Sequence, residues 1–205
     1  MNIYLVRHGQ KMEDDKNHES LELTDRGFIQ ADIVGKRLKN YNIDKIYSSN
    51  MKRAIQTAET INNHLNVEIT ISNDIREIHM GVCDTKGWAY LQEKYPDFIK
   101  EFNKHETDLR YPPDGECGED VWNRAMNLIN EIINSDLENV VVVTHGGVIR
   151  SILCGVLQLH QARRFCLGAP PENCSISIIK YNKNTNKFCL HSFNDYAHLD
   201  GCPPQ

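Results

Sequence analysis

The sequence predicts an α/β fold, a three-layer α/β/α sandwich whose central sheet is mostly parallel and has an antiparallel edge. Short apolar runs alternate with longer segments of helical periodicity along most of the 205 residues. The run at 140–144 is unbroken and β-branched, which is typical of a buried strand in the centre of a parallel sheet. Near the end of the chain, 175–179 and 188–191 alternate like strands and are joined through 182–186, which predicts an antiparallel hairpin.

The first strand is expected over 3–7, an apolar and partly β-branched run. His8 and Gly9 follow Arg7 at the point where this strand ends. Ligands of open α/β sheets lie outside the carboxyl ends of the strands, so an Arg-His pair placed there is expected to face a pocket. A polar loop, 10–22, comes next.

Two helices are expected in the following part of the chain. Thr24 is positioned to cap the first, whose predicted apolar face comprises Phe28, Ala31, Val34, Gly35 and Leu38. A strand at 45–48 leads to the second, for which Ser49 and Asn50 are the cap candidates. Arg53 lies in its first turn. The helix dipole disfavours a cation there, so Arg53 is expected either to be solvated or to hold an anion.

The middle of the chain changes character after a predicted third strand at 67–71. Residues 79–117 are rich in aromatic residues and prolines and are interpreted as a lid-like insertion with one helix over 86–104. Helical periodicity returns over 118–135. Because no stretch has the composition of a linker, residues 1–205 are expected to form a single domain.

The strongest strand, 140–144, ends at His145, and Gly146 and Gly147 follow it. The next helix is expected to turn Ile149, Ile152, Leu153, Val156 and Leu157 inward. This order of strand, histidine and glycine repeats that of the first strand. Two central strands would therefore deliver His8 and His145 to the same edge of the sheet.

Composition excludes several classes of function. The chain carries 23 Lys and Arg against 28 Asp and Glu, a formal net charge of −5, and has no basic run, which argues against nucleic acid as the main partner. No apolar segment is long enough for a membrane span, and no secretory leader is recognised, so we expect a cytoplasmic protein that does not enter membranes. P-loop, dinucleotide-binding and Gly-x-Ser-x-Gly motifs are absent, and the last absence disfavours a serine esterase.

The cysteines and histidines favour neither disulfides nor a metal site. The seven cysteines are odd in number and contain no Cys-x-x-Cys pair, which predicts reduced thiols. The histidines other than His8 and His145 show no ligand spacing such as His-x-His. We therefore expect neither a metal nor an organic cofactor.

Several segments together resemble the histidine phosphatase superfamily, also called phosphoglycerate mutase-like. The similar pieces are 5–9 (LVRHG), 23–31 (LTDRGFIQA), 48–58 (SSNMKRAIQTA), 76–78 (REI), 115–117 (GEC) and 143–147 (VTHGG). Their order and spacing span nearly the whole chain. Within the family, 173–176 and 193–199 resemble α-ribazole phosphatase-like members.

The resemblance implies an enzyme of the phosphatase branch that acts on a small phosphorylated substrate. It implies His8 as the nucleophile and Glu77 as the proton donor. The implied phosphate ligands are Arg7, Arg53 and His145, and the amides of Gly146 and Gly147 at a helix start would add neutral donors. Two arginines and a cationic histidine can stabilise a transferring phosphoryl group without a metal.

The two histidines are expected to differ in protonation. His8 must be unprotonated at the attacking nitrogen, so a backbone carbonyl should hold its other N–H. His145 should favour the cationic form beside phosphate. Glu77 would protonate the leaving oxygen and then activate water for hydrolysis of the phosphohistidine, with Asp84 as the second candidate for this role.

The chain departs from the family pattern at several positions. Lys11 and Asp14 stand where many relatives have a Ser or Thr and an Asn that bind phosphate, and Gly146 stands where some members have an acidic proton donor. Two other functions remain open, a phosphoglycerate mutase and a catalytically silent protein that binds a phosphorylated ligand. The oligomeric state is expected to be a monomer or a homodimer.

Overall fold

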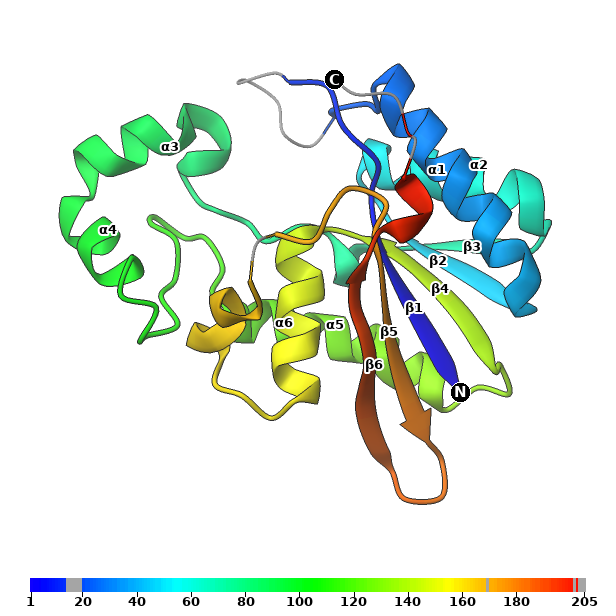
Figure 1. The fold of residues 1–205 in the computed structure, drawn as a ribbon. Helices are drawn as coiled ribbons and strands as arrows, with labels where there is room; N and C mark the ends of the chain where they lie inside the picture. Colours follow the sequence, from blue (N-terminus) through cyan, green and yellow to red (C-terminus); the bar gives the residue numbers. More distant parts are fainter. Residues whose placement is uncertain (14–19, 169, 201, 203–205) are drawn as a thin grey trace.

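The computed structural model describes residues 1–13, 20–168, 170–200 and 202 of the chain. Within them, a six-stranded sheet has the strand order β3-β2-β4-β1-β5-β6 (Figure 1). The parallel strands are β1 (Asn2–Arg7), β2 (Lys45–Ser49), β3 (Glu68–Ser72) and β4 (Asn139–Thr144). The antiparallel edge consists of β5 (Ile176–Asn182) and β6 (Lys187–Asp195). The predicted α/β class and the antiparallel edge are both confirmed.

Strand β4 lies between β1 and β2, and its register with each of them brings the ends of the three strands to the same edge of the sheet. Arg7 on β1 pairs with Thr144 on β4, and Val143 on β4 pairs with Ser48 on β2. In a parallel sheet such pairs lie at the same height, so the residues that follow them emerge at one edge.

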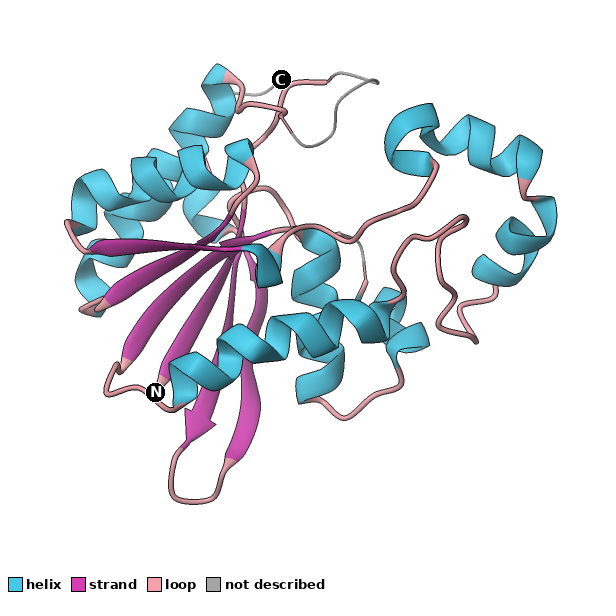
Figure 2. Cartoon of the chain, turned by 180° about the vertical axis from the view of Figure 1, so that it is seen from behind, coloured by secondary structure: helices cyan, strands magenta, loops and turns pink. Residues whose placement is uncertain are grey.

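Helices cover both faces of the sheet, which gives the predicted three layers (Figure 2). Helices α1 (Asp25–Leu38) and α2 (Lys52–Leu65) pack on one face, and α5 (Gly118–Ile133) and α6 (Gly146–Val156) on the other. Short 3₁₀ turns are Lys39–Tyr41, Asn73–Ile75, Gln161–Leu167 and Ala197–Leu199.

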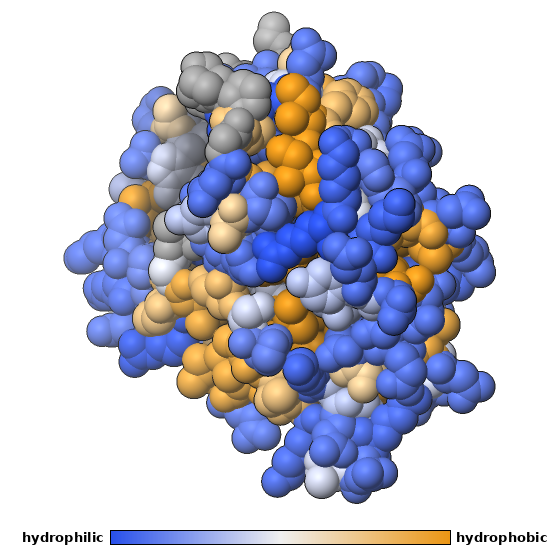
Figure 3. Space-filling view, turned by 45° about the vertical axis from the view of Figure 1, so that its right-hand side comes forward, coloured by the Kyte–Doolittle hydropathy of each residue, from blue (hydrophilic) through white to orange (hydrophobic). Residues whose placement is uncertain are grey.

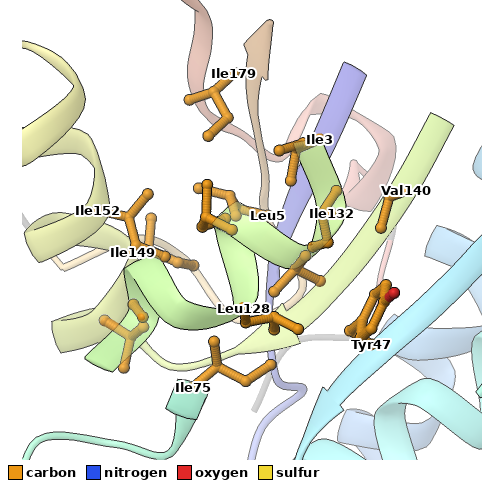
Figure 4. Close-up of a cluster of buried hydrophobic side chains, with 14 of the residues drawn as sticks. Ile3, Leu5, Tyr47, Ile75, Leu128, Ile132, Val140, Ile149, Ile152 and Ile179 are labelled. Atoms are coloured by element: carbon orange, nitrogen blue, oxygen red, sulfur yellow. The ribbon is translucent and has the colours of Figure 1, made fainter. Parts of the chain in front are cut away.

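The core beneath α5 and α6 is built from branched aliphatic side chains (Figure 4). Its fully buried members include Ile3, Leu5, Ile75, Ile129, Ile132, Val140, Val142, Ile149 and Ile152. Burial of this apolar surface is the main stabilising contribution to the fold, and the β-branched strands suit a sheet that is covered on both faces.

The insertion differs from the prediction. The single helix expected over 86–104 is wrong, because the segment forms α3 (Cys83–Lys94) and α4 (Pro96–Phe102). Pro96 lacks a backbone N–H and begins the second helix, while Tyr95 before it has a non-helical φ of −129°. A further kink lies at Gly87, which has φ +78°. The two helices extend away from the sheet (Figure 1).

Other local predictions had mixed outcomes. Thr24 caps α1 as expected, since its side chain accepts a hydrogen bond from the amide of Gly27. The caps predicted for α2 are wrong, because Met51 occupies the N-cap. Phe28 and Leu157, expected to face inward, are 39% and 38% exposed. Leu157 caps the end of α6 and lies outside its buried stripe.

The face shown in Figure 3 is mostly hydrophilic, with hydrophobic side chains in small groups. Among the helices in the described part of the chain, none combines the length and apolar character needed to cross a bilayer. All seven cysteines fall within that part, and each is a free thiol.

Candidate active site

His8 and His145 meet at the edge of the sheet where β1 and β4 end. Their ring centroids lie 5.1 Å apart, and the ring planes are tilted by 57°. Both residues are buried, with His8 only 3% exposed and His145 fully enclosed. The parallel pairing of β1 and β4 explains this proximity, since each histidine directly follows one member of the Arg7–Thr144 pair.

A backbone carbonyl fixes the tautomer of His8, as predicted. The Nδ1 atom of His8 lies 2.7 Å from the carbonyl oxygen of Gly9. A carbonyl oxygen only accepts hydrogen bonds, so Nδ1 carries the proton and the neutral ring keeps its lone pair on Nε2. The turn around His8 is held in place by Thr57, whose hydroxyl accepts from the Gly9 amide at 3.0 Å, and by Asn173, whose amide donates to the His8 carbonyl at 2.9 Å.

His145 is held by a side chain instead. It forms the N-cap of α6, and its Nε2 lies 2.8 Å from the hydroxyl oxygen of Ser49 at the end of β2. The same hydroxyl accepts from the amide of Met51 at 3.3 Å. The Nδ1 atom of His145 is buried and has no hydrogen-bond partner among the described residues. A buried polar atom of this kind is costly unless another group pairs with it.

Two arginines approach the histidine pair. Arg53, only 3% exposed, comes from the first turn of α2, and its Nη2 contacts the sulfur of Met51 at 3.3 Å. Arg7 donates from Nη1 to the carbonyl of Pro171 at 2.5 Å. The Arg7 side chain also lies beside the start of α6: a Cβ built on Gly146 would be 3.6 Å from Arg7 Nε. Both guanidinium groups act electrostatically on both histidine rings.

The site concentrates positive charge in a desolvated place. Burial, followed by Arg53 and Arg7, lowers the pKa of His8 well below its usual value. Burial, His8 and Arg53 lower the pKa of His145 in the same way. The protein groups alone therefore hold both rings neutral near pH 7, and the imidazolium expected at His145 requires the charge of a phosphoryl group.

Glu77 lies beside the N-terminus of α6. Its Oε1 accepts from the amide of Ile78 at 2.9 Å, and its Oε2 lies 3.4 Å from the amide nitrogen of Gly147. A Cβ on Gly147 would come within 2.6 Å of Oε1, so a side chain at this position would displace the Glu77 carboxylate. The Gly147 amide, expected to serve phosphate, thus faces the Glu77 carboxylate.

A partly buried ion pair holds the backbone of Glu77. Arg124 of α5 donates to the carbonyl of Glu77 at 3.3 Å and to that of Asp74 at 2.7 Å. Its Nε also pairs with Glu116 at 2.7 Å. Asp84, the second candidate for the proton donor, instead accepts from the amide of Met80 at 2.8 Å inside the insertion.

Two hollows flank Arg7. One, of about 430 Å³, is lined by Arg7, His8 and Lys11 together with Gln10, Met12, Glu13, Thr24 and Asn173. The other, of about 210 Å³, contains Glu77. Its further lining is mainly apolar and aromatic, with two arginines: Ile78, Met80, Tyr111, Phe165, Pro170, Arg150 and Arg164. Asp14, the other departure from the family pattern, lies outside the described residues.

Sequence reasoning missed four residues that position the site, namely Ser49, Thr57, Arg124 and Asn173. Ser49 and Thr57 lie inside the 48–58 segment quoted for the family resemblance, and Asn173 lies in 173–176, but no local pattern revealed their partners. Arg124 had no sequence signal. Among the described residues, no group of three or more His, Cys, Asp or Glu side chains is placed to hold a metal ion.

Similarity to known proteins shows the family to which this chain belongs. Residues 3–195 match the histidine phosphatase superfamily (branch 1). Phosphoglycerate mutase-like protein 4 of Arabidopsis thaliana is 36% identical over 159 residues, which cover 73% of this chain and 68% of that protein. The metal-independent phosphoserine phosphatase of the same plant is 29% identical over 204 residues, covering 96% and 82%.

Solved structures agree with this assignment. The complex of a mycobacterial glucosyl-3-phosphoglycerate phosphatase with inorganic phosphate superposes with a TM-score of 0.83 at 25% identity, covering 96% of this chain and 98% of that one. The resemblance inferred from the motifs is thereby confirmed. The chain belongs to the histidine phosphatase superfamily, branch 1, and is an enzyme of the phosphatase class.

Proposed function

We propose that the chain is a cytoplasmic, metal-independent phosphomonoester hydrolase that acts on a small phosphorylated metabolite through a phosphohistidine on His8. The hydrogen bond from His8 Nδ1 to the Gly9 carbonyl carries this proposal. It leaves the lone pair of Nε2 as the nucleophile, and the lowered pKa of His8 keeps that lone pair unprotonated near neutral pH.

In the first step, Nε2 of His8 attacks phosphorus in line with the ester oxygen, and the phosphorus–oxygen bond to the alcohol breaks. Arg7 and Arg53 would bind the non-bridging oxygens, since a guanidinium fits phosphate geometry with two parallel donors. The unpartnered Nδ1 of His145 and the amide of Gly146 at the start of α6 would supply further donors. Positioning and charge stabilisation account for most of the catalysis of such transfers.

Glu77 would complete this step by protonating the leaving alkoxide. Its position in the 210 Å³ hollow assigns that hollow to the leaving group. In the second step Glu77, now unprotonated, takes a proton from water as the water attacks the phosphohistidine, which restores His8 and releases phosphate. The insertion at 79–117 contributes Met80 and Tyr111 to the same hollow, so we also propose that it serves as the lid over the leaving group.

The experiment is to incubate the purified protein with a panel of phosphomonoesters and measure released phosphate. The panel includes phosphoserine and a phosphoglycerate, which occur in the names of relatives, and α-ribazole phosphate, which the C-terminal motifs suggest. Quenching with alkaline detergent after a short incubation with labelled substrate should trap a phosphoenzyme that is stable to alkali and labile to acid, and that His8→Ala lacks. Efficient interconversion of phosphoglycerates, with little release of phosphate, would contradict the hydrolase and indicate a phosphoglycerate mutase.

A catalytically silent phosphate-binding protein is the other alternative. It would bind inorganic phosphate without turning over any ester of the panel and without forming the labelled phosphoenzyme. Trapping that intermediate therefore separates this alternative from the hydrolase.

A further inference from the structure

Lys11 lies at the entrance to the candidate active site on a well-fixed stretch of backbone. It forms an antiparallel bridge with Leu23. On either side of it, the Met12 amide donates to the carbonyl of Glu22 at 2.8 Å, and the Thr24 amide donates to that of Gln10 at 2.9 Å. The residues just before α1 thus hold the Lys11 backbone in place.

The charge of Lys11 faces the phosphate-binding groups. Lys11 is partly buried and lines the 430 Å³ hollow with Arg7 and His8. It lowers the pKa of His8, and burial and the charges of Arg53 and Arg7 lower its own. Lys11 therefore shares the wall of this hollow with Arg7 and His8, and the positive charges of Lys11, Arg7 and Arg53 oppose one another.

Glu13 is the competing partner for this ammonium group. It lines the same hollow and raises the pKa of Lys11, but burial and Arg53 lower that pKa by more. The surroundings of Lys11 are therefore cationic on balance. Holding three partly or wholly desolvated cations together is unfavourable, and an anion between them would offset this cost.

We propose that Lys11 is a third cationic ligand of the transferring phosphoryl group, beside Arg7 and Arg53. This inference rests on the proposed function only in placing a phosphoryl group at His8. Lys11 stands where many family members are expected to have a neutral hydroxyl. The ammonium would add a point charge near the non-bridging oxygens, which strengthens both the binding of inorganic phosphate and the stabilisation of the transition state.

The test measures the dissociation constant of inorganic phosphate by calorimetry for the wild type, Lys11→Met and Lys11→Arg. A hydrogen-bonded ammonium should make Lys11→Met bind phosphate at least about 10-fold more weakly, while Lys11→Arg stays within a few-fold of the wild type. Lys36→Met is the matched control, because Lys36 is exposed, pairs with Asp32 in α1 and changes the net charge equally. Unchanged phosphate affinity in Lys11→Met would overturn the proposal.

Turnover of p-nitrophenyl phosphate, which carries no charged group apart from the phosphate, locates the contact. If Lys11 binds the phosphoryl group, Lys11→Met lowers kcat/KM for this substrate as well as for phosphoserine. A loss confined to substrates with anionic leaving groups would place Lys11 on the leaving group and refute the inference. Lys11→Gln repeats the binding measurement in case the Met variant does not fold.

The two proposals can fail separately. A wild type that hydrolyses no ester but binds phosphate in a Lys11-dependent manner would refute the hydrolase and retain the role of Lys11. If the wild type hydrolyses esters and Lys11→Met binds phosphate as tightly as the wild type, the hydrolase is retained and the role of Lys11 is refuted.

Discussion

His8 and His145 occupy matching places in the sheet and differ in what holds their rings. Each directly follows a parallel strand, is buried, and has its pKa lowered by burial and by Arg53 and Arg7. His8 is held by the Gly9 carbonyl, which can only accept, whereas His145 is held by the Ser49 hydroxyl, which can accept or donate.

This difference fixes the tautomer of His8 and leaves the protonation of His145 adjustable. Because the carbonyl binds the Nδ1 proton of His8, its Nε2 stays available as a nucleophile. The hydroxyl of Ser49 can accept a hydrogen bond from a cationic His145 or donate one to a neutral His145, so His145 can gain a proton when an anion binds. This difference at two similar strand ends supports the proposed roles, in which His8 forms the bond to phosphorus and His145 carries charge.

The largest expected effect separates these roles directly. His8→Ala removes the atom that bonds to phosphorus, so turnover should fall by about 10⁴-fold or more and no phosphoenzyme should form. His145→Ala removes charge stabilisation only, with an expected loss of about 10²- to 10³-fold and a phosphoenzyme that still forms slowly. Rapid quenching with labelled substrate measures both. A phosphoenzyme in His8→Ala that is absent from His145→Ala would reverse the assignment.

A second prediction concerns Glu77, for which we propose a role toward the leaving group rather than the phosphoryl group. Glu77→Gln should slow alkyl phosphates by about 10²- to 10⁴-fold, because a poor leaving group needs a proton. The effect on p-nitrophenyl phosphate should be much smaller, since its leaving group is stable without a proton. Steady-state kcat/KM on both substrates makes the measurement. Equal slowing of the two would show that Glu77 is not the proton donor.

The strands that deliver the histidines could be predicted from sequence because their signals are local. The buried run of β4, the apolar run of β1 and the Thr24 cap are each visible within a few residues. The proximity of His8 and His145 follows from the topology, since neighbouring parallel strands end at the same edge of the sheet. Arg53 became a candidate through its place in the first turn of a predicted helix, and the motif resemblance added Glu77.

Contacts between distant segments could not be predicted in this way. Ser49 and His145 are 96 positions apart, and their contact depends on the register of β2 against β4. Arg124 reaches the Glu77 carbonyl from α5, 47 positions further along the chain. The break between α3 and α4 had a visible signal in Pro96, which begins α4, but the prediction of one helix ran through it. Register and side-chain direction are properties of packing, which no single segment encodes.

A third prediction follows from the lowered pKa of His145. A bound dianion should raise that pKa, so the protein takes up a proton on binding, and affinity should increase as the pH falls from 8 to 6. Sulfate is the suitable probe because it stays a dianion in this range. Calorimetry in buffers of different ionisation enthalpy measures the uptake, expected to be up to about one proton. His145→Asn should abolish it and His8→Asn should retain it; the opposite pattern would contradict the assignment.

The smallest expected effect tests Ser49 itself, as a positioning residue that acts through His145. Ser49→Ala removes the partner of Nε2, and we expect kcat to fall by about 10-fold while His8 still forms the phosphoenzyme. Because the hydroxyl can also stabilise the imidazolium, its loss should disfavour that form and shift the acid-side increase in sulfate affinity to lower pH. Ser49→Thr, which keeps a hydroxyl, should restore both properties. If Ser49→Ala lowers activity without moving the pH dependence of sulfate binding, Ser49 supports the fold of the site but not the charge on His145.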